Sequence, residues 1–90
     1  MPNLVDLSLC AEARRALHRV LSERGLGFFV KSSPGRGPHL DSRRIAWVVE
    51  VARRQSRERR CDPDALARIR SVLRRELIRR LAETMVRAGL

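Results

Sequence analysis

The sequence predicts an all-α fold: a small three-helix domain over residues 1–90, with an irregular Gly- and Pro-containing segment between helices one and two. Apolar residues recur with the three- and four-residue spacing of an amphipathic helix in three separate stretches. The length of 90 residues suits one small domain. Only 3% of the residues are aromatic, so the core must consist mainly of aliphatic side chains, which suits packed helices.

The first helix is predicted over residues 9–24. Its apolar stripe consists of Leu9, Ala13, Ala16, Leu17 and Val20. Asp6 or Ser8 is expected to cap the start of this helix, because short polar side chains bond the free amides of a first turn. Gly25 is placed to end it.

Residues 25–41 are predicted to be a loop between helices. A short apolar run that contains Phe28 and Phe29 is typical of extended chain or a short strand. No second strand is evident to pair with it, so we expect no sheet and expect both rings to fill the helical core. Arg36 stands between two glycines that let the backbone approach a phosphate, which makes it a candidate loop contact. A plain flexible connector is the favoured alternative, because no known phosphate-loop spacing is present.

The second helix is predicted over residues 42–60, with Asp41 as its N-cap. Ile45, Val48, Val49 and Ala52 are expected to form its buried stripe. At 100° per residue, five arginines gather on the opposite flank: Arg43, Arg53, Arg54, Arg57 and Arg60. Glu50 lies among them and can pair with Arg53 or Arg54.

The third helix is predicted over residues 63–88, with Asp62 as cap, Pro63 in the first turn and Gly89 as its stop. Its apolar stripe comprises Leu66, Ile69, Leu73, Leu77 and Leu81, followed by Met85. This stripe can pack within the chain or pair with a second copy as a homodimer. Opposite the stripe lie Arg68, Arg75 and Arg79, whereas Arg70, Arg74 and Arg80 flank it.

The charge is strongly unbalanced. Twenty basic residues, of which nineteen are arginine, face ten acidic ones, for a net charge of +10. Residues 43–60 hold seven arginines and two glutamates, and residues 68–80 hold six arginines and one glutamate, so the excess lies wholly in the last two helices. Codon usage in a GC-rich genome is one of two competing explanations for the preference for arginine over lysine, but it does not explain this clustering. Arginine-rich faces of this kind favour the phosphates of DNA or RNA.

We therefore expect a non-enzymatic nucleic-acid-binding protein, in which RNA or DNA backbone is the partner and a larger ribonucleoprotein or regulatory complex is one setting. The expected phosphate contacts are Arg43, Arg53, Arg54, Arg57, Arg60, Arg68, Arg75 and Arg79. The alternative is a helical protein-interaction adaptor or homodimer that docks on an acidic protein. Trp47 lies away from the buried stripe, and it suits core packing, a protein interface or stacking on an unpaired base.

Other classes of function are not expected. The sequence has no activated-nucleophile motif and no phosphate-binding glycine loop, and the pair His39 and Asp41 alone is a weak sign of catalysis. Cys10, Cys61 and the two histidines lack the close spacing of a zinc site, so no metal or other cofactor is expected. No apolar run reaches the roughly 18 residues of a membrane span and no signal peptide is evident, so we expect a soluble, cytoplasmic protein without membrane contact.

Overall fold

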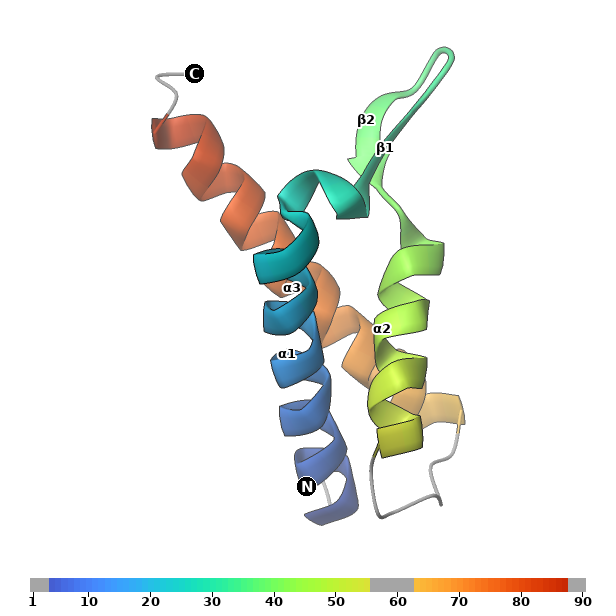
Figure 1. Cartoon of the computed structure of the whole chain (residues 1–90). Helices are drawn as coiled ribbons and strands as arrows, with labels where there is room; N and C mark the ends of the chain where they lie inside the picture. Colours follow the sequence, from blue (N-terminus) through green and yellow to red (C-terminus); the bar gives the residue numbers. More distant parts are fainter. Residues whose placement is uncertain (1–3, 56–62, 88–90) are drawn as a thin grey trace.

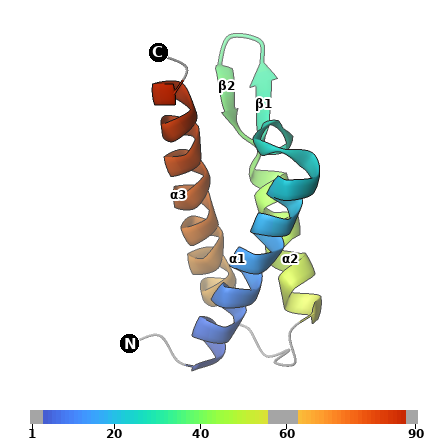
Figure 2. The ribbon, with the colours of Figure 1, turned by 60° about the vertical axis from the view of Figure 1, so that its left-hand side comes forward.

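The computed structural model describes residues 4–55 and 63–87. Three helices pack against one another in pairs, and a β-hairpin projects beyond them between the first and second helices (Figure 1). In chain order the elements are α1 (Leu4–Arg24), the 3₁₀ helix η1 (Leu26–Phe29), β1 (Val30–Ser33), β2 (Gly37–Leu40), α2 (Ser42–Gln55) and α3 (Pro63–Arg87). The C-terminal half of α3 and the hairpin extend past the helical core at the same end of the molecule (Figure 2).

Helix α1 begins earlier than predicted, at Leu4 instead of residue 9. Asp6 and Ser8, the expected caps, are therefore part of the helix. No glycine or proline lies between Leu4 and Leu9, so nothing in the backbone opposes the extra turn. The predicted end is confirmed: the helix stops at Arg24, and Gly25, at φ 80°, donates its N–H to the carbonyl of Leu21 at 2.9 Å.

The prediction of an all-α fold is wrong, because the segment between α1 and α2 contains an antiparallel two-stranded sheet. Val30 pairs with Leu40, and the register continues to Ser33 opposite Gly37. The N–H of Arg36 donates to the carbonyl of Ser33 at 3.1 Å and closes a tight turn. Gly35 supplies the positive φ of 79° that the third position of a type II turn requires.

The second strand was hidden because its sequence, Gly37 to Leu40, contains a glycine and a proline and shows no apolar alternation. In a two-stranded sheet each strand is an edge, so Pro38 can lack an N–H without breaking a central ladder. Leu40 is buried, and it ties the end of β2 to the helical core.

Helices α2 and α3 start where predicted. One carboxylate oxygen of Asp41 accepts the backbone N–H of Arg43 at 3.0 Å and that of Arg44 at 3.4 Å, so Asp41 is the N-cap of α2. Helix α3 starts at Pro63. The structure describes α2 as far as Gln55 and α3 as far as Arg87. The expected end of α2 at residue 60, the Asp62 cap and the end of α3 at residue 88 lie outside the described residues.

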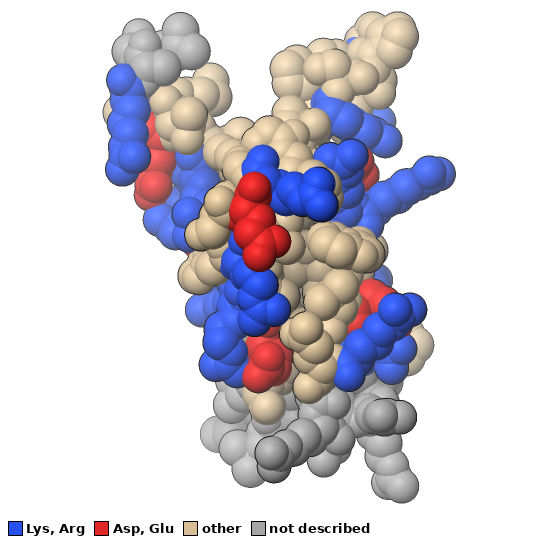
Figure 3. Space-filling view, in the orientation of Figure 1, with Lys and Arg blue, Asp and Glu red and all other residues tan. Residues whose placement is uncertain are grey.

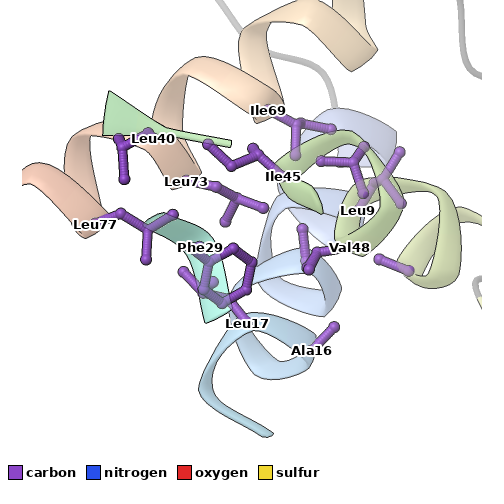
Figure 4. Close-up of a cluster of buried hydrophobic side chains, with 13 residues drawn as sticks. Leu9, Ala16, Leu17, Phe29, Leu40, Ile45, Val48, Ile69, Leu73 and Leu77 are labelled. Atoms are coloured by element: carbon purple, nitrogen blue, oxygen red, sulfur yellow. The ribbon is translucent and has the colours of Figure 1, made fainter. Parts of the chain in front are cut away.

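The core joins all three helices with the segment between α1 and α2 (Figure 4). Its buried side chains are Leu9, Ala13, Ala16, Leu17, Phe29, Leu40, Ile45, Val48, Val49, Ala52, Ile69, Leu73 and Leu77. Phe29 fills the core as predicted, whereas Phe28 is only half-buried against it. The middle of the predicted α3 stripe, Ile69 to Leu77, is thus already buried within the chain, while Met85 at its end is 55% exposed.

Candidate functional site

Two hollows meet at the first turn of α2, and together we call them the basic groove. The larger, of about 520 Å³, lies between α2 and α3 and is lined by Ser42, Arg43, Ile45, Ala46, Ala67, Arg70, Ser71 and Arg74. The smaller, of about 250 Å³, lies at the foot of the hairpin and is lined by Lys31, Arg36, His39, Leu40, Asp41, Ser42, Arg43 and Arg74. Because Ser42, Arg43 and Arg74 belong to both, the two hollows adjoin each other at these residues.

Cations dominate the basic groove. Lys31 comes from β1, Arg36 from the hairpin turn, Arg43 from α2, and Arg70 and Arg74 from α3. All five side chains belong to exposed residues. Figure 3 shows basic side chains projecting from the edge of the molecule where the hairpin meets α2, whereas acidic and basic side chains lie side by side over α1.

One acidic residue, Asp41, belongs to the lining. Its carboxylate is already engaged within the protein, because one oxygen caps α2 and the other lies 3.6 Å from the Nε of Arg44. Lys31, Arg36, Arg43 and Arg70 make no ion pair with any acidic side chain in the part of the chain that the structure describes. The positive potential of the groove is therefore largely uncompensated.

The backbone adds to this potential. The groove surrounds Ser42 and Arg43, the first two residues of α2, where the helix dipole is positive. Arg74 is held in the groove by a long hydrogen bond of 3.4 Å from its Nη1 to the Oγ of Ser42. Ile45, Ala46 and Ala67 form an apolar floor below these polar groups.

The predicted contacts at the C-terminal part of α2 are engaged with an acidic residue. Arg53 donates from its Nε to Glu50 at 3.0 Å, and Arg54 lies 3.4 Å from the same carboxylate. The hydrogen bond from Arg53 is the main reason why the pKa of Glu50 lies below its usual value. Arg57 and Arg60 lie outside the described residues.

Two of the predicted α3 contacts, Arg75 and Arg79, differ in their surroundings. Arg79 bonds Glu76 and Glu83, each at 2.7 Å. Hydrogen bonding to Arg79 lowers the pKa of Glu76, and the pKa of Arg79 is correspondingly raised. Arg75 lines a separate hollow beside Arg14. Arg68 is exposed on α3 and belongs to neither of the two hollows of the groove.

The structure thus brings together two of the predicted contacts, Arg36 and Arg43, and adds three cations that sequence reasoning did not select: Lys31, Arg70 and Arg74. The four-residue spacing of Arg70 and Arg74 was a usable signal, because it places both on one face of α3. Lys31 could not be selected from the sequence, because its place beside the groove depends on the β-hairpin, which was not predicted.

Trp47 lies on α2 outside the basic groove, and 50% of it is exposed. Its ring centroid is 6.0 Å from that of Phe28, in an edge-to-face arrangement. The guanidinium of Arg44 stacks over Phe28 at 4.1 Å from the ring centroid, and its Nη1 donates to the Phe28 carbonyl at 2.6 Å. Trp47 therefore packs on one side and faces solvent on the other.

Comparison of the chain with known protein families, with curated proteins and with solved structures finds no match. Across residues 4–55 and 63–87, no group of three or more His, Cys, Asp or Glu side chains is arranged to hold a metal ion. None of the helices in that part of the chain has the length and apolar character needed to span a membrane.

Proposed function

We propose that this chain is a non-enzymatic nucleic-acid-binding protein whose basic groove contacts the phosphate backbone. The observation that carries the proposal is the convergence of five cations from four segments around two adjoining hollows. None of the five makes an ion pair with an acidic side chain among the described residues, since Arg74 bonds the hydroxyl of Ser42, so their charge is available to a ligand. A concave surface of one sign concentrates an oppositely charged polymer.

The chemistry of the groove suits phosphate. The planar guanidinium of Arg43 or Arg70 can donate two parallel hydrogen bonds to one phosphate group. The N-terminus of α2 is already capped by the carboxylate of Asp41, so the side-chain cations are the groups that would bind phosphate oxygens. Neutralised phosphates release their condensed counterions, which provides a driving force that does not depend on base sequence.

This arrangement changes the expected ranking of the contacts. Arg36 and Arg43 remain, together with Lys31, Arg70 and Arg74 of the groove. Arg53, Arg54 and Arg79 would each have to give up or share an acidic partner to reach a phosphate. They contribute less than an uncompensated arginine for that reason.

An acidic protein partner is the second candidate. The apolar floor between α2 and α3, made by Ile45, Ala46 and Ala67, favours it, because an amphipathic acidic helix presents both charge and apolar surface. Phosphate backbone is preferred because four of the five cations, namely Lys31, Arg36, Arg43 and Arg74, line the smaller hollow beyond that floor.

The proposal is tested by reversing charge within the groove. In the variant Arg43→Glu/Arg74→Glu we expect the affinity for labelled single-stranded RNA, duplex RNA or duplex DNA to fall at least about 100-fold, measured by fluorescence anisotropy. The fold should survive, because both side chains are exposed and a glutamate in the first turn of α2 suits its dipole.

The matched control is Arg14→Glu/Arg87→Glu, which changes the net charge equally at exposed positions outside the groove. It should retain binding within about threefold to tenfold of the wild type, since it alters only the long-range field. Equal losses in the two variants would show that net charge, and not the groove, governs binding.

A further inference from the structure

We propose that Trp47 stacks on an unpaired base of a single-stranded nucleic acid whose phosphates lie in the basic groove. This inference rests on the proposed function and adds to it the class of ligand, a single strand in preference to a duplex. It is carried by the hollow beside Trp47, by the aromatic contacts that hold the indole, and by the position of Trp47 relative to Arg43.

A hollow of about 180 Å³ lies between α1 and α2, with Trp47 as one wall. Its remaining lining is Ala16, Arg19, Val20, Glu23, Val48 and Val51. The aliphatic walls suit the flat face of a base. Arg19 as a donor and Glu23 as an acceptor stand at the same hollow and can pair with polar groups on the edge of a base.

The indole is held in place by contacts that lead into the core. Phe28 meets Trp47 at an angle of 62°, and it meets the buried Phe29 at 89° with a centroid distance of 5.2 Å. Arg44 covers Phe28 from another direction. An aromatic side chain fixed in this way loses little conformational entropy when a base stacks on it.

Trp47 lies on the same helix as Arg43 of the basic groove and close to it. It follows Arg43 by four residues on α2, which places the two about 6 Å apart along the helix axis and about 40° apart around it. The groove lies on the α3 side of α2 and the hollow beside Trp47 on its α1 side, so a strand with one phosphate at Arg43 has to cross the exposed face of α2 to present a neighbouring base to Trp47. In a duplex the bases are paired and stacked inside, where an indole on a helix surface does not reach them.

The charges around Trp47 favour a nucleotide over an apolar protein segment. Arg19 lines the hollow, and Arg24 lies 5.7 Å from the Phe28 centroid, so cations stand on the α1 side. On the α2 side Arg43 leads into the basic groove. Glu23 is the one acidic residue in the lining of this hollow.

The test uses the fluorescence of Trp47, the single tryptophan of the chain. The probes are an oligothymidylate of roughly 12 nucleotides, an abasic strand of the same length and a duplex of the same length. We expect saturable quenching by the oligothymidylate alone, although the abasic strand and the duplex also bind by anisotropy. Equal affinity for the oligothymidylate and the abasic strand, without quenching, overturns the stacking inference and leaves the proposed function intact. Absence of binding to all three probes overturns both.

Two variants separate stacking from packing. Trp47→Leu should lose about 5- to 100-fold in affinity for the oligothymidylate and keep its affinity for the abasic strand, which also reports that the groove is folded. Trp47→Phe, which retains a ring, should recover most of the loss. If the emission of the wild type instead shifts with protein concentration alone, a second copy of the chain covers Trp47, and the inference is wrong.

Discussion

Arg43 and Arg44 are neighbours in the sequence and have different tasks in the structure. Arg43 is exposed in the basic groove without an acidic partner among the described residues. Arg44 is committed to the fold, because it stacks on Phe28, donates to the Phe28 carbonyl and lies near Asp41. Successive residues of a helix point about 100° apart, which is sufficient to separate a binding residue from a structural one.

A pair of alanine substitutions tests this division. Arg44→Ala should lower the free energy of unfolding by about 1–2 kcal/mol, because it removes a cation–π contact and a charged hydrogen bond at a partly exposed site. Arg43→Ala should change stability by less than about 0.5 kcal/mol and weaken nucleic-acid binding. Urea unfolding followed by circular dichroism gives the stabilities. If both variants are equally stable, Arg44 has no special structural role.

Neighbouring acidic residues decide which other arginines remain available. Glu50 was predicted from the sequence to pair with Arg53 or Arg54, and in the structure it contacts both. Glu76 has the same effect, which was not predicted, because it engages Arg79 and Arg80. Both sets of pairs have i,i+3 or i,i+4 spacing within one helix, so they were readable from the sequence. Candidate arginines for phosphate contacts are better ranked by whether they lack an acidic partner than by the helix face on which they lie.

At the scale of the element, the three helices were predictable and the hairpin was not. Each helix carries a local signal: the 3–4 apolar spacing of α1, the Asp41 cap of α2 and the Pro63 start of α3. The hairpin depends on pairing between two four-residue strands, one of which contains Pro38. Its local signal was the dipeptide Pro34-Gly35, which favours a turn but lies within the predicted loop of residues 25–41.

The cap of α2 links helix stability to binding, because Asp41 is also the one acidic residue in the lining of the groove. Asp41→Asn keeps a good cap and removes the negative charge. We therefore expect about two- to fivefold tighter binding of nucleic acid, measured by anisotropy, with a loss of stability below about 1 kcal/mol.

Asp41→Ala is the matched comparison. It removes the same charge together with the cap, which should cost about 1 kcal/mol or more of stability in thermal unfolding. Weaker binding by Asp41→Asn than by the wild type would contradict the assignment of the groove as an anion site.

At the scale of the whole molecule, the groove exists only because the fold brings together segments that are distant in the sequence. Lys31 and Arg36 come from the hairpin region, and Arg70 and Arg74 are more than thirty residues further along the chain. Helix periodicity locates residues on one helix but does not say which helices pack side by side. For this reason the sequence shows the excess of arginine in the last two helices but does not reveal the groove. The groove is evident only from the tertiary structure.

The same packing bears on self-association. The sequence left open whether the α3 stripe pairs with a second copy, and in the structure Ile69, Leu73 and Leu77 are buried in the core of the chain. A homodimer through those three side chains would require the core to open. Outside the core, Ile78, Met85 and Val86 are the large apolar residues of α3 that remain exposed.

The most direct test of the central claim is the salt dependence of binding to an oligothymidylate, measured by anisotropy for the wild type and for Arg43→Ala/Arg74→Ala. If the five cations of the groove each neutralise one phosphate of this single strand, the wild-type slope of log affinity against log salt is about −3.5. The double variant should have a slope smaller in magnitude by about 1.4, because one phosphate contact is lost for each arginine removed. An unchanged slope in the variant would contradict the account, because the phosphates would then be bound elsewhere on the molecule.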